Sequence, residues 1–172
     1  EKLPDEKSRN EILATLFPSR TISYAKAMVE AVKNGSIYDI YADHAEIYRE
    51  NGTYLDGAHA MMKDTLKLTS AFPDMTVTMR DTFAVKYEDG YKLWRYFIMS
   101  GTNKTYSVYG PASNKPLNSD ACIVMSMATV KQISGRWQIV KEFVMYSIDE
   151  IRATCLNTEV DACDSAAKEE EV

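Results

Sequence analysis

The first 72 residues carry apolar side chains three and four positions apart, which is the spacing of one helix face. This spacing predicts three helices, which cover residues 5–17, 19–34 and 56–72. The first is a short docking helix. Ser19 or Thr21 can cap the second helix, and Asn34-Gly35 supplies its left-handed end. The third helix ends near Phe72, because Pro73 cannot continue it.

Beyond Pro73 the apolar period changes to two, as it does in strands whose side chains alternate between two faces. Such runs cover residues 75–79, 82–87, 91–101, 120–133 and 137–146. Asp89-Gly90 and Ser134-Gly135 predict hairpin turns between them. Ser147 followed by Glu150 is a capping-box pattern, so a last short helix is expected just after Ser147.

Helices followed by a meander of strands indicate an α+β domain, with the helices packed on one face of a curved antiparallel sheet. A helical turn over residues 37–41 and a brief strand over residues 45–48 complete the expected elements. The predicted domain covers residues 20–156. Residues 1–19 form an extension that contains the docking helix, and residues 157–172 form an acidic tail that is expected to be disordered.

Charge is distributed unevenly along the 172 residues of the chain. Residues 158–172 carry six acids and one lysine, which accounts for the whole net charge of -5, so the rest of the chain is neutral. The chain has no basic stripe with interleaved aromatic residues, and this argues against a nucleic-acid partner. No apolar stretch approaches the ~20 residues of a membrane span.

Cysteine and histidine predict neither a metal site nor a disulfide framework. The three cysteines have no CxxC spacing, and His44 and His59 are not spaced as a ligand pair. Nucleotide-binding and serine-hydrolase motifs are absent, so no cofactor is predicted. The composition, with 45% hydrophobic and 26% charged residues, predicts a soluble globular domain. Because the first residue is Glu rather than Met, we expect a processed or excised N-terminus. No compartment is predicted.

Four short motifs follow one another along most of the chain. They are Phe72-Pro73-Asp74-Met75, Ser100-Gly101-Thr102, Tyr109-Gly110-Pro111 and the pair Phe143 and Ser147. Together with the order of the predicted elements, they resemble the SnoaL-like polyketide cyclase branch of the nuclear transport factor 2 and ketosteroid isomerase superfamily. The resemblance implies a cone-shaped α+β barrel around an apolar pocket. It also implies that the pocket binds a small, mostly apolar molecule, with cofactor-free proton transfer as its chemistry.

The catalytic positions depart from the pattern of that family. Its acid/base aspartate falls on Ser147, and its pocket His or Arg falls on Lys131. A serine hydroxyl cannot relay a proton near neutral pH without a partner. Lys131 is typical of a rim lysine, but an amine pointing into the cone would have a lowered pKa and could act as an acid, a base or an anion clamp. Ser147 and Lys131 are the candidate catalytic residues, because they occupy the positions of the family's catalytic groups.

Strand periodicity gives candidate ligand-binding residues, because alternate positions of two adjacent strands would point into the cone. The resulting pocket would be rich in methionine and aromatic side chains, although such residues more often fill a core. Trp94 and Tyr96 would either join this pocket or face the covering helices. The full set of candidates is Tyr24, Tyr48, Trp94, Tyr96, Met125, Met127, Thr129, Phe143 and Met145.

Two other functions stay open. An interaction or assembly module would use an exposed sheet face to form a homodimer or a larger protein complex, as domains similar to this one often do. An epoxide-type hydrolase is the less favoured of the two, because it would need an Asp-Arg-Asp set and the residues considered for it, Arg49, Asp81 and Arg95, do not complete one. A ligand-binding domain predicts a closed apolar pocket, whereas an assembly module predicts a filled cone and an exposed apolar patch.

Overall fold

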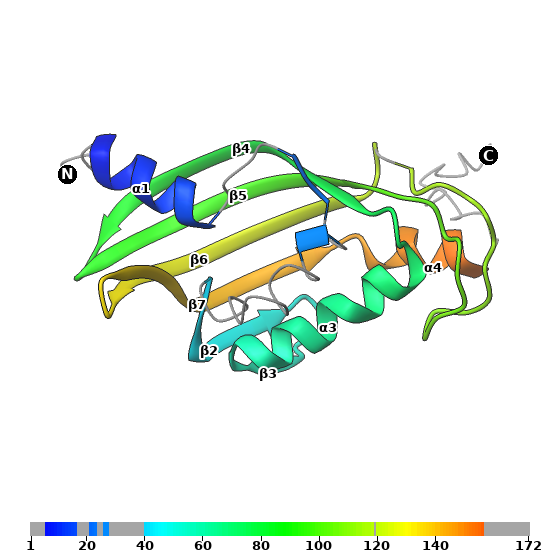
Figure 1. Cartoon of the computed structure of the whole chain (residues 1–172), viewed down its shortest axis with the longest axis horizontal. Coiled ribbons are helices and arrows are strands. Elements are labelled where there is room, and N and C mark those ends of the chain that lie inside the picture. The colour runs from blue at the N-terminus through cyan, green and yellow to red at the C-terminus, as the bar shows by residue number, and fades with distance from the viewer. Residues whose placement is uncertain (1–5, 17–20, 24–25, 28–39, 119, 157–172) are drawn as a thin grey trace, which may run out of the picture.

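The computed structural model describes residues 6–16, 21–23, 26–27, 40–118 and 120–156 (Figure 1). The helices are α1 (Glu6–Leu16), α3 (Gly57–Ala71) and α4 (Ile148–Leu156). None of the helices in this described part of the chain is long and apolar enough to cross a membrane. The strands are β1 (Thr21–Ser23), β2 (Tyr41–Arg49), β3 (Tyr54–Asp56), β4 (Thr76–Tyr87), β5 (Gly90–Ser100), β6 (Ile123–Ile133) and β7 (Arg136–Tyr146).

The strands form one seven-stranded sheet in the order β1-β4-β5-β6-β7-β2-β3. Strands β4 to β7 are a long antiparallel meander, and β2 joins the far edge parallel to β7. The two runs expected at 75–79 and 82–87 are one strand, because a bulge between Met79 and Asp81 lets β4 continue through the break in its pattern. The predicted α+β class with a largely antiparallel sheet is confirmed.

The helices cover one face of this sheet, called the inner face. Helix α3 lies along β2, and α1 lies near the hairpin ends of the long strands (Figure 1). Met61 of α3 packs with Phe97 and Val144 of the sheet in one core cluster. Ile12 and Leu16 of α1 belong to a second core cluster, so the expected docking helix is confirmed. The opposite face, called the open face, carries exposed side chains.

Two segments that were expected to be helical are strands. Thr21–Ser23 forms β1 and pairs with residues 76–78 of β4. Its β-branched residues suit an edge strand, and the backbone groups of β4 need a partner there. Tyr41 does not lie in a helical turn but begins β2, which is nine residues long. Apart from residues 26–27, the rest of the expected second helix lies outside the described residues, as does the acidic tail.

The hairpin turns at the ends of the long strands lie close to their expected positions. Ser134 and Gly135 have φ angles of 50° and 79° and form the predicted two-residue turn between β6 and β7. The β4–β5 turn comes one residue earlier than predicted, because Glu88 has the positive φ of 51° and Gly90 already begins β5. Gly90 is not part of the turn. A glycine is needed there because the backbones of β5 and β6 approach closely, and a Cβ at this position would collide with the backbone carbonyl of Val130.

Candidate functional site

Four polar side chains meet on the inner face of the sheet and form one network, called the interior cluster. The Tyr41 hydroxyl, on β2, donates a hydrogen bond of 2.7 Å to Oε2 of Glu142, on β7. Oε1 of the same carboxylate accepts short hydrogen bonds from Nη2 of Arg95, on β5, and from Oγ of Ser126, on β6. Nη2 of Arg95 also donates to Oγ of Ser126 at 3.0 Å. The carboxylate is therefore held by three different donors.

The interior cluster is deeply buried within the core. Glu142 is 1% exposed, Ser126 4% and Arg95 9%. Burying an ion pair costs several kcal/mol of solvation energy per ion, which only good geometry and additional hydrogen bonds offset. Removing one partner would cost about 3–5 kcal/mol, because it would leave a buried charge uncompensated. A core is ordinarily apolar, and departures from this rule are expected at functional sites, so the interior cluster is the best candidate site.

Strand register brings the members of the interior cluster together. Arg95 and Ser126 lie directly opposite each other in the β5–β6 pair. Glu142 reaches the inner face after a bulge in the β6–β7 pair, which changes the alternation of β7. Glu142 was not predicted because the face of Phe143 and Met145 was expected to be the interior, and Tyr41 was not predicted because that residue was assigned to a helical turn. The sequence signal that could have indicated the interior cluster is Arg95, the single arginine of β5, and Glu142, the single acid of β7.

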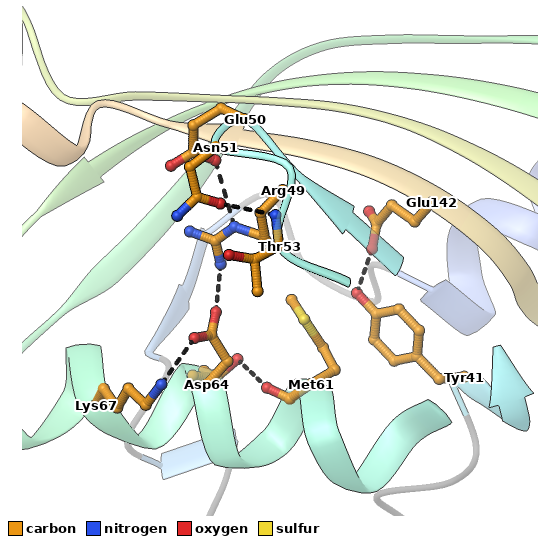
Figure 2. A network of polar contacts seen from close by, with 10 residues as sticks. Tyr41, Arg49, Glu50, Asn51, Thr53, Met61, Asp64, Lys67 and Glu142 are labelled. Carbon is orange, nitrogen blue, oxygen red and sulfur yellow. Dashed lines mark hydrogen bonds and ion pairs between the residues drawn. The ribbon is translucent and has the colours of Figure 1, made fainter. Parts of the chain in front are cut away.

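A second arginine–carboxylate pair lies beside the interior cluster (Figure 2). Arg49, at the end of β2, forms a short ion pair with Asp64 of α3. The guanidinium of Arg49 also lies 3.7 Å from the centre of the Tyr146 ring. Figure 2 shows the side chain of Met61 between this pair and the Tyr41 hydroxyl. The pair therefore ties the end of β2 to α3, at a place distinct from the interior cluster.

The Asp-Arg-Asp set of an epoxide-type hydrolase is not assembled in this structure. Arg95 binds Glu142, and Arg49 binds Asp64. Asp81 lies at the bulge of β4 and lines a groove on the open face. Arg95 lines the same groove, but its guanidinium is engaged with Glu142, and Arg49 lies outside the groove.

Lys131 lies at the rim of the sheet beside the β4–β5 turn. Its Nζ is 2.7 Å from Oδ1 of Asp89 and 3.6 Å from Oε2 of Glu88. The hydrogen bond to Asp89 raises the pKa of Lys131 above its ordinary value. A catalytic lysine was expected only if its amine pointed into the cone and had a lowered pKa. That condition is not met, and the contacts of Lys131 are those of a rim ion pair.

Ser147 joins the end of β7 to the start of β6. Its Oγ accepts a hydrogen bond of 2.9 Å from the backbone N–H of Ile123 and donates one of 3.2 Å to the carbonyl of Ile123. Glu150, the expected capping-box partner, instead accepts a hydrogen bond from the backbone N–H of Asn118 at 3.2 Å. The hydroxyl of Ser147 is therefore engaged with the backbone.

A row of aromatic and methionine side chains, called the aromatic row, crosses the open face of the sheet. Each member lies opposite the next one in the strand register. From β4 to β3 the aromatic row consists of Phe83, Trp94, Met127, Phe143, Tyr48 and Tyr54. The rings of Phe83 and Trp94 stack 5.9 Å apart, and those of Tyr48 and Phe143 stack 5.1 Å apart. Six of the predicted ligand-binding residues surround a groove of about 290 Å³ along this row, namely Trp94, Tyr96, Met125, Met127, Phe143 and Met145.

The predicted ligand-binding residues lie on the opposite face from the one expected. Phe143 is 43% exposed and Met145 is 50% exposed on the open face, whereas their neighbour Val144 is 3% exposed on the inner face. Thr129 lies on β6 opposite Lys141, on the open face beyond the groove, and Tyr24 lies outside the described residues. A period of two separates the faces of a strand without showing which face is covered, and here both faces carry apolar side chains.

Two of the motifs that carry the family resemblance, Phe72-Pro73-Asp74-Met75 and Ser100-Gly101-Thr102, hold the end of α3 to the end of β5. Oδ1 of Asp74 accepts a hydrogen bond of 2.8 Å from the backbone N–H of Thr102, and Oδ2 lies 2.6 Å from Nζ of Lys104. A Cβ on Gly101 would lie 3.3 Å from the Cβ of Phe72, so only glycine leaves ordinary space there. These motifs therefore encode the fold and supply no reactive group to the interior cluster.

No protein-family model matches the chain, and no curated protein matches its sequence. Solved structures do match its fold. Aln2 from a Streptomyces species is 18% identical, with 88% of this chain and 99% of that chain covered at a TM-score of 0.61. A candidate SnoaL-like polyketide cyclase from a Jannaschia species is 11% identical, with 90% and 96% covered at a TM-score of 0.61.

An NTF2-like protein with a cystatin-like fold from Novosphingobium aromaticivorans is 10% identical, with 83% of this chain and 81% of that chain covered at a TM-score of 0.51. Identities this low establish the fold alone. The resemblance stated from the motifs is confirmed at that level. The chain has the cone-shaped α+β fold that SnoaL-like and nuclear transport factor 2-like proteins share.

Proposed function

We propose that the chain binds a small, mostly apolar molecule inside the cone and catalyses cofactor-free proton transfer on it, as an isomerase or cyclase does. The observation that carries this proposal is the interior cluster. A carboxylate, a phenol and an arginine are the groups that move protons and stabilise oxyanions in enzymes. Here Glu142, Tyr41 and Arg95 are held together within an apolar interior.

The surroundings of the interior cluster support the proposal. Leu93 and Phe97 flank Arg95 on the inner face of β5, and both belong to the apolar core. Apolar walls with a few convergent polar groups are typical of small-molecule sites. Glu142 also supplies a carboxylate inside the cone, where the family position at Ser147 supplies none. The fold is shared with a protein named as a candidate polyketide cyclase, which agrees with a site of this kind.

Binding of 2-tetralone tests this proposal, because this bicyclic ketone is mostly apolar and has acidic C–H bonds beside one carbonyl group. We expect saturable binding to the wild-type chain in isothermal titration calorimetry. The dissociation constants of Met127→Ala and Met145→Ala should equal that of the wild type, because both residues lie on the open face. Absence of saturable binding at millimolar concentrations would overturn the proposal. Loss of binding in the two variants would place the ligand in the open-face groove instead.

A second candidate function, assembly through the open face, is favoured by the aromatic row. Phe83 is 54% exposed, Tyr54 50% and Trp94 40%. Contiguous exposed apolar side chains on a folded chain mark interaction surfaces. Stacked aromatic pairs add to the energy of such contacts when they are buried. The aromatic row therefore fits a protein–protein interface that a partner would cover.

A second copy of the chain is the partner that suits this face best. Lys92, Thr129, Lys141, Glu46 and Asp56 follow one another in the register beside the aromatic row, with bases toward one end and acids at the other. A two-fold axis parallel to the strands would place Lys92, at one end of this line, over the acids at the other end, whereas Lys141 pairs with Glu46 of its own chain at 2.9 Å. The same axis would also place the aromatic row of one copy over that of the other, so the face is self-complementary.

A further inference from the structure

We propose that the groove on the open face binds a small organic cation, in which an ammonium group is attached to an apolar body. The ammonium group contacts the carboxylate of Asp81, and the apolar body lies on Trp94 and Met127. The groove lies apart from the interior cluster, so this inference does not depend on binding inside the cone. Because the groove borders the aromatic row, its ligand competes with a second copy for the open face.

The groove has the size and the lining of a small-molecule site. Its volume is about 290 Å³, close to the lower end of the roughly 300–1,000 Å³ that is usual for such sites. Its walls are mostly aromatic and methionine side chains, and the flexible methionines can adapt to a ligand of irregular shape. A groove of this size suits a ligand with one ring and a short side chain.

Asp81 gives the groove a negative charge. A bulge between Met79 and Asp81 shifts the register of β4, so that Asp81 lies opposite Tyr96 on the open face. The side chain is exposed, and its Oδ1 accepts a hydrogen bond of 2.8 Å from the backbone N–H of Thr82. Within the described part of the chain, no lysine or arginine forms an ion pair with this carboxylate. The carboxylate is therefore accessible to the cation of a ligand.

The basic residues of the neighbouring positions do not neutralise this charge. The guanidinium of Arg95 binds Glu142 on the inner face. Nζ of Lys92 lies 4.2 Å from the centre of a tyrosine ring, and Nζ of Lys141 lies 2.9 Å from a glutamate oxygen. Arg80 precedes the carboxylate in the bulge but does not line the groove. The groove therefore favours a cation over an anion.

Aromatic rings beside the carboxylate also favour a cation, because the face of an aromatic ring attracts an ammonium group. Phe83 follows Asp81 by two residues on the same face of β4, and Tyr96 lies directly opposite Asp81. The ring of Phe83 stacks on that of Trp94, with the ring centres 5.9 Å apart. The aromatic surface thus continues from the charged end of the groove to its apolar middle, which suits a cation with an apolar body.

Three ligands of similar shape and different charge test this proposal. At pH 7, 2-phenylethylamine is a cation, 2-phenylethanol is neutral and 3-phenylpropanoate is an anion. In isothermal titration calorimetry at one protein concentration, we expect the wild-type chain to bind the amine roughly tenfold more tightly than the alcohol, because an exposed ion pair and a contact between cation and ring each contribute modestly. The anion should bind no more tightly than the alcohol. Equal affinity for the amine and the alcohol, or no binding of the amine, would overturn the proposal.

Variants show whether Asp81 causes the preference for the cation. Asp81→Asn should bind the amine and the alcohol with dissociation constants within a factor of about two of each other. Asp120→Asn is the matched control, since it removes the same charge from an exposed position of the loop before β6, and it should keep the tenfold preference. Trp94→Leu should weaken both ligands about fivefold, because the apolar body loses its aromatic contact. A preference for the amine that persists in Asp81→Asn would overturn the assignment.

Methionine methyl groups locate the bound amine without any variant. Met125 and Met145 line the groove, whereas Met61 and Met75 lie in the interior. In ¹³C-methyl-methionine protein, the amine should shift the NMR signals of Met125 and Met145 and leave those of Met61 and Met75 unchanged. Shifts confined to the interior methionines would overturn the proposal. Saturation with the amine should leave the dissociation constant of 2-tetralone unchanged, so a failure of the groove site and a failure of binding inside the cone are seen separately.

Discussion

Asp74 shows at the scale of one residue how a family motif stabilises the fold. Burial alone would raise the pKa of Asp74, but the hydrogen bonds from Lys104 and from the backbone of Thr102 outweigh it and lower the pKa below its ordinary value. A carboxyl group with a lowered pKa in the folded state stabilises that state above its unfolded pKa. This contribution is lost as the pH falls through the folded pKa.

Replacement of this carboxylate should therefore have a pH-dependent effect. Because the side chain of Asp74 is 38% exposed, we expect Asp74→Asn to lower the free energy of unfolding by about 1 kcal/mol at pH 7. The difference from the wild type should begin to shrink below about pH 4, where the carboxyl of the unfolded chain becomes protonated, and should vanish below the lowered pKa of the folded state. Urea denaturation of both proteins at pH 7 and at a pH below about 4 measures this difference in the free energy of unfolding. An equal difference at both values would show that the ion pair contributes nothing.

Ser147 occupies the acid/base position of the resembled family, yet its hydroxyl binds the backbone of Ile123. Ser147→Ala should lower the free energy of unfolding by about 1 kcal/mol, the net contribution of a hydrogen bond of this kind. Exchange of the protons beside the carbonyl of 2-tetralone in D₂O, followed by proton NMR, should keep its wild-type rate. A loss of exchange without a loss of stability would restore the serine as a catalytic candidate.

Single residues also show where prediction from the sequence ends. Motif residues such as Phe72 and Asp74 could be recognised, because their roles depend on short local spacing. Glu142 could not, since it alternates regularly with Phe143 and Met145, and the pattern does not show which of these two faces is covered. Tyr41 reaches Glu142 across 101 positions of the chain, through the parallel pairing of β2 with β7. The interior cluster is a product of this long-range pairing.

At the scale of elements, helix and strand positions were largely predictable from periodicity and turn residues. The long strands and α3 agree closely with their expected ranges. Which face of each strand is covered was not predictable. Met125 and Met127 on one face of β6 are as apolar as Val124 and Ala128 on the other. The packing of α1 and α3 decides which face becomes the interior, and strand periodicity carries no information about it.

The β4–β5 hairpin offers a test of close packing between elements. A Cβ at Gly90 would collide with the carbonyl of Val130 on β6, whereas Gly52 has open space around it and only a positive φ of 78°. We expect Gly90→Ala to lower the free energy of unfolding by about 2–3 kcal/mol and Gly52→Ala by about 1 kcal/mol. Chemical denaturation of the two variants measures this. Equal losses would show that Gly90 serves only the turn.

At the scale of the whole molecule, the two faces of the sheet have different chemistry. The inner face encloses a polar cluster in an apolar core, and the open face presents the aromatic row. Binding of the mostly apolar molecule belongs to the inner face in our account, and assembly belongs to the open face. The two functions can therefore be removed separately.

Self-association should depend on the centre of the aromatic row. We expect sedimentation equilibrium to give the mass of a dimer for the wild-type chain and that of a monomer for Met127→Glu, because a carboxylate would be buried among apolar side chains at the contact. Gln132→Glu is the matched control, since it adds the same charge to an exposed position of β6 outside the row, and it should stay dimeric. A wild-type monomer, or a dimer in Met127→Glu, would exclude the open face as the self-association surface.

Methionine methyl groups report on both faces of the sheet at once, and they provide the most direct test of the central claim that the ligand binds inside the cone. Met61, Met75 and Met99 lie in the interior, at 6%, 1% and 1% exposure, whereas Met125 and Met145 lie on the open face at 48% and 50%. In a titration of ¹³C-methyl-methionine protein with 2-tetralone, we predict that the NMR signal of Met61, beside Tyr41 in Figure 2, shifts while those of Met125 and Met145 do not. Shifts confined to Met125 and Met145 would contradict the account and place the ligand on the open face.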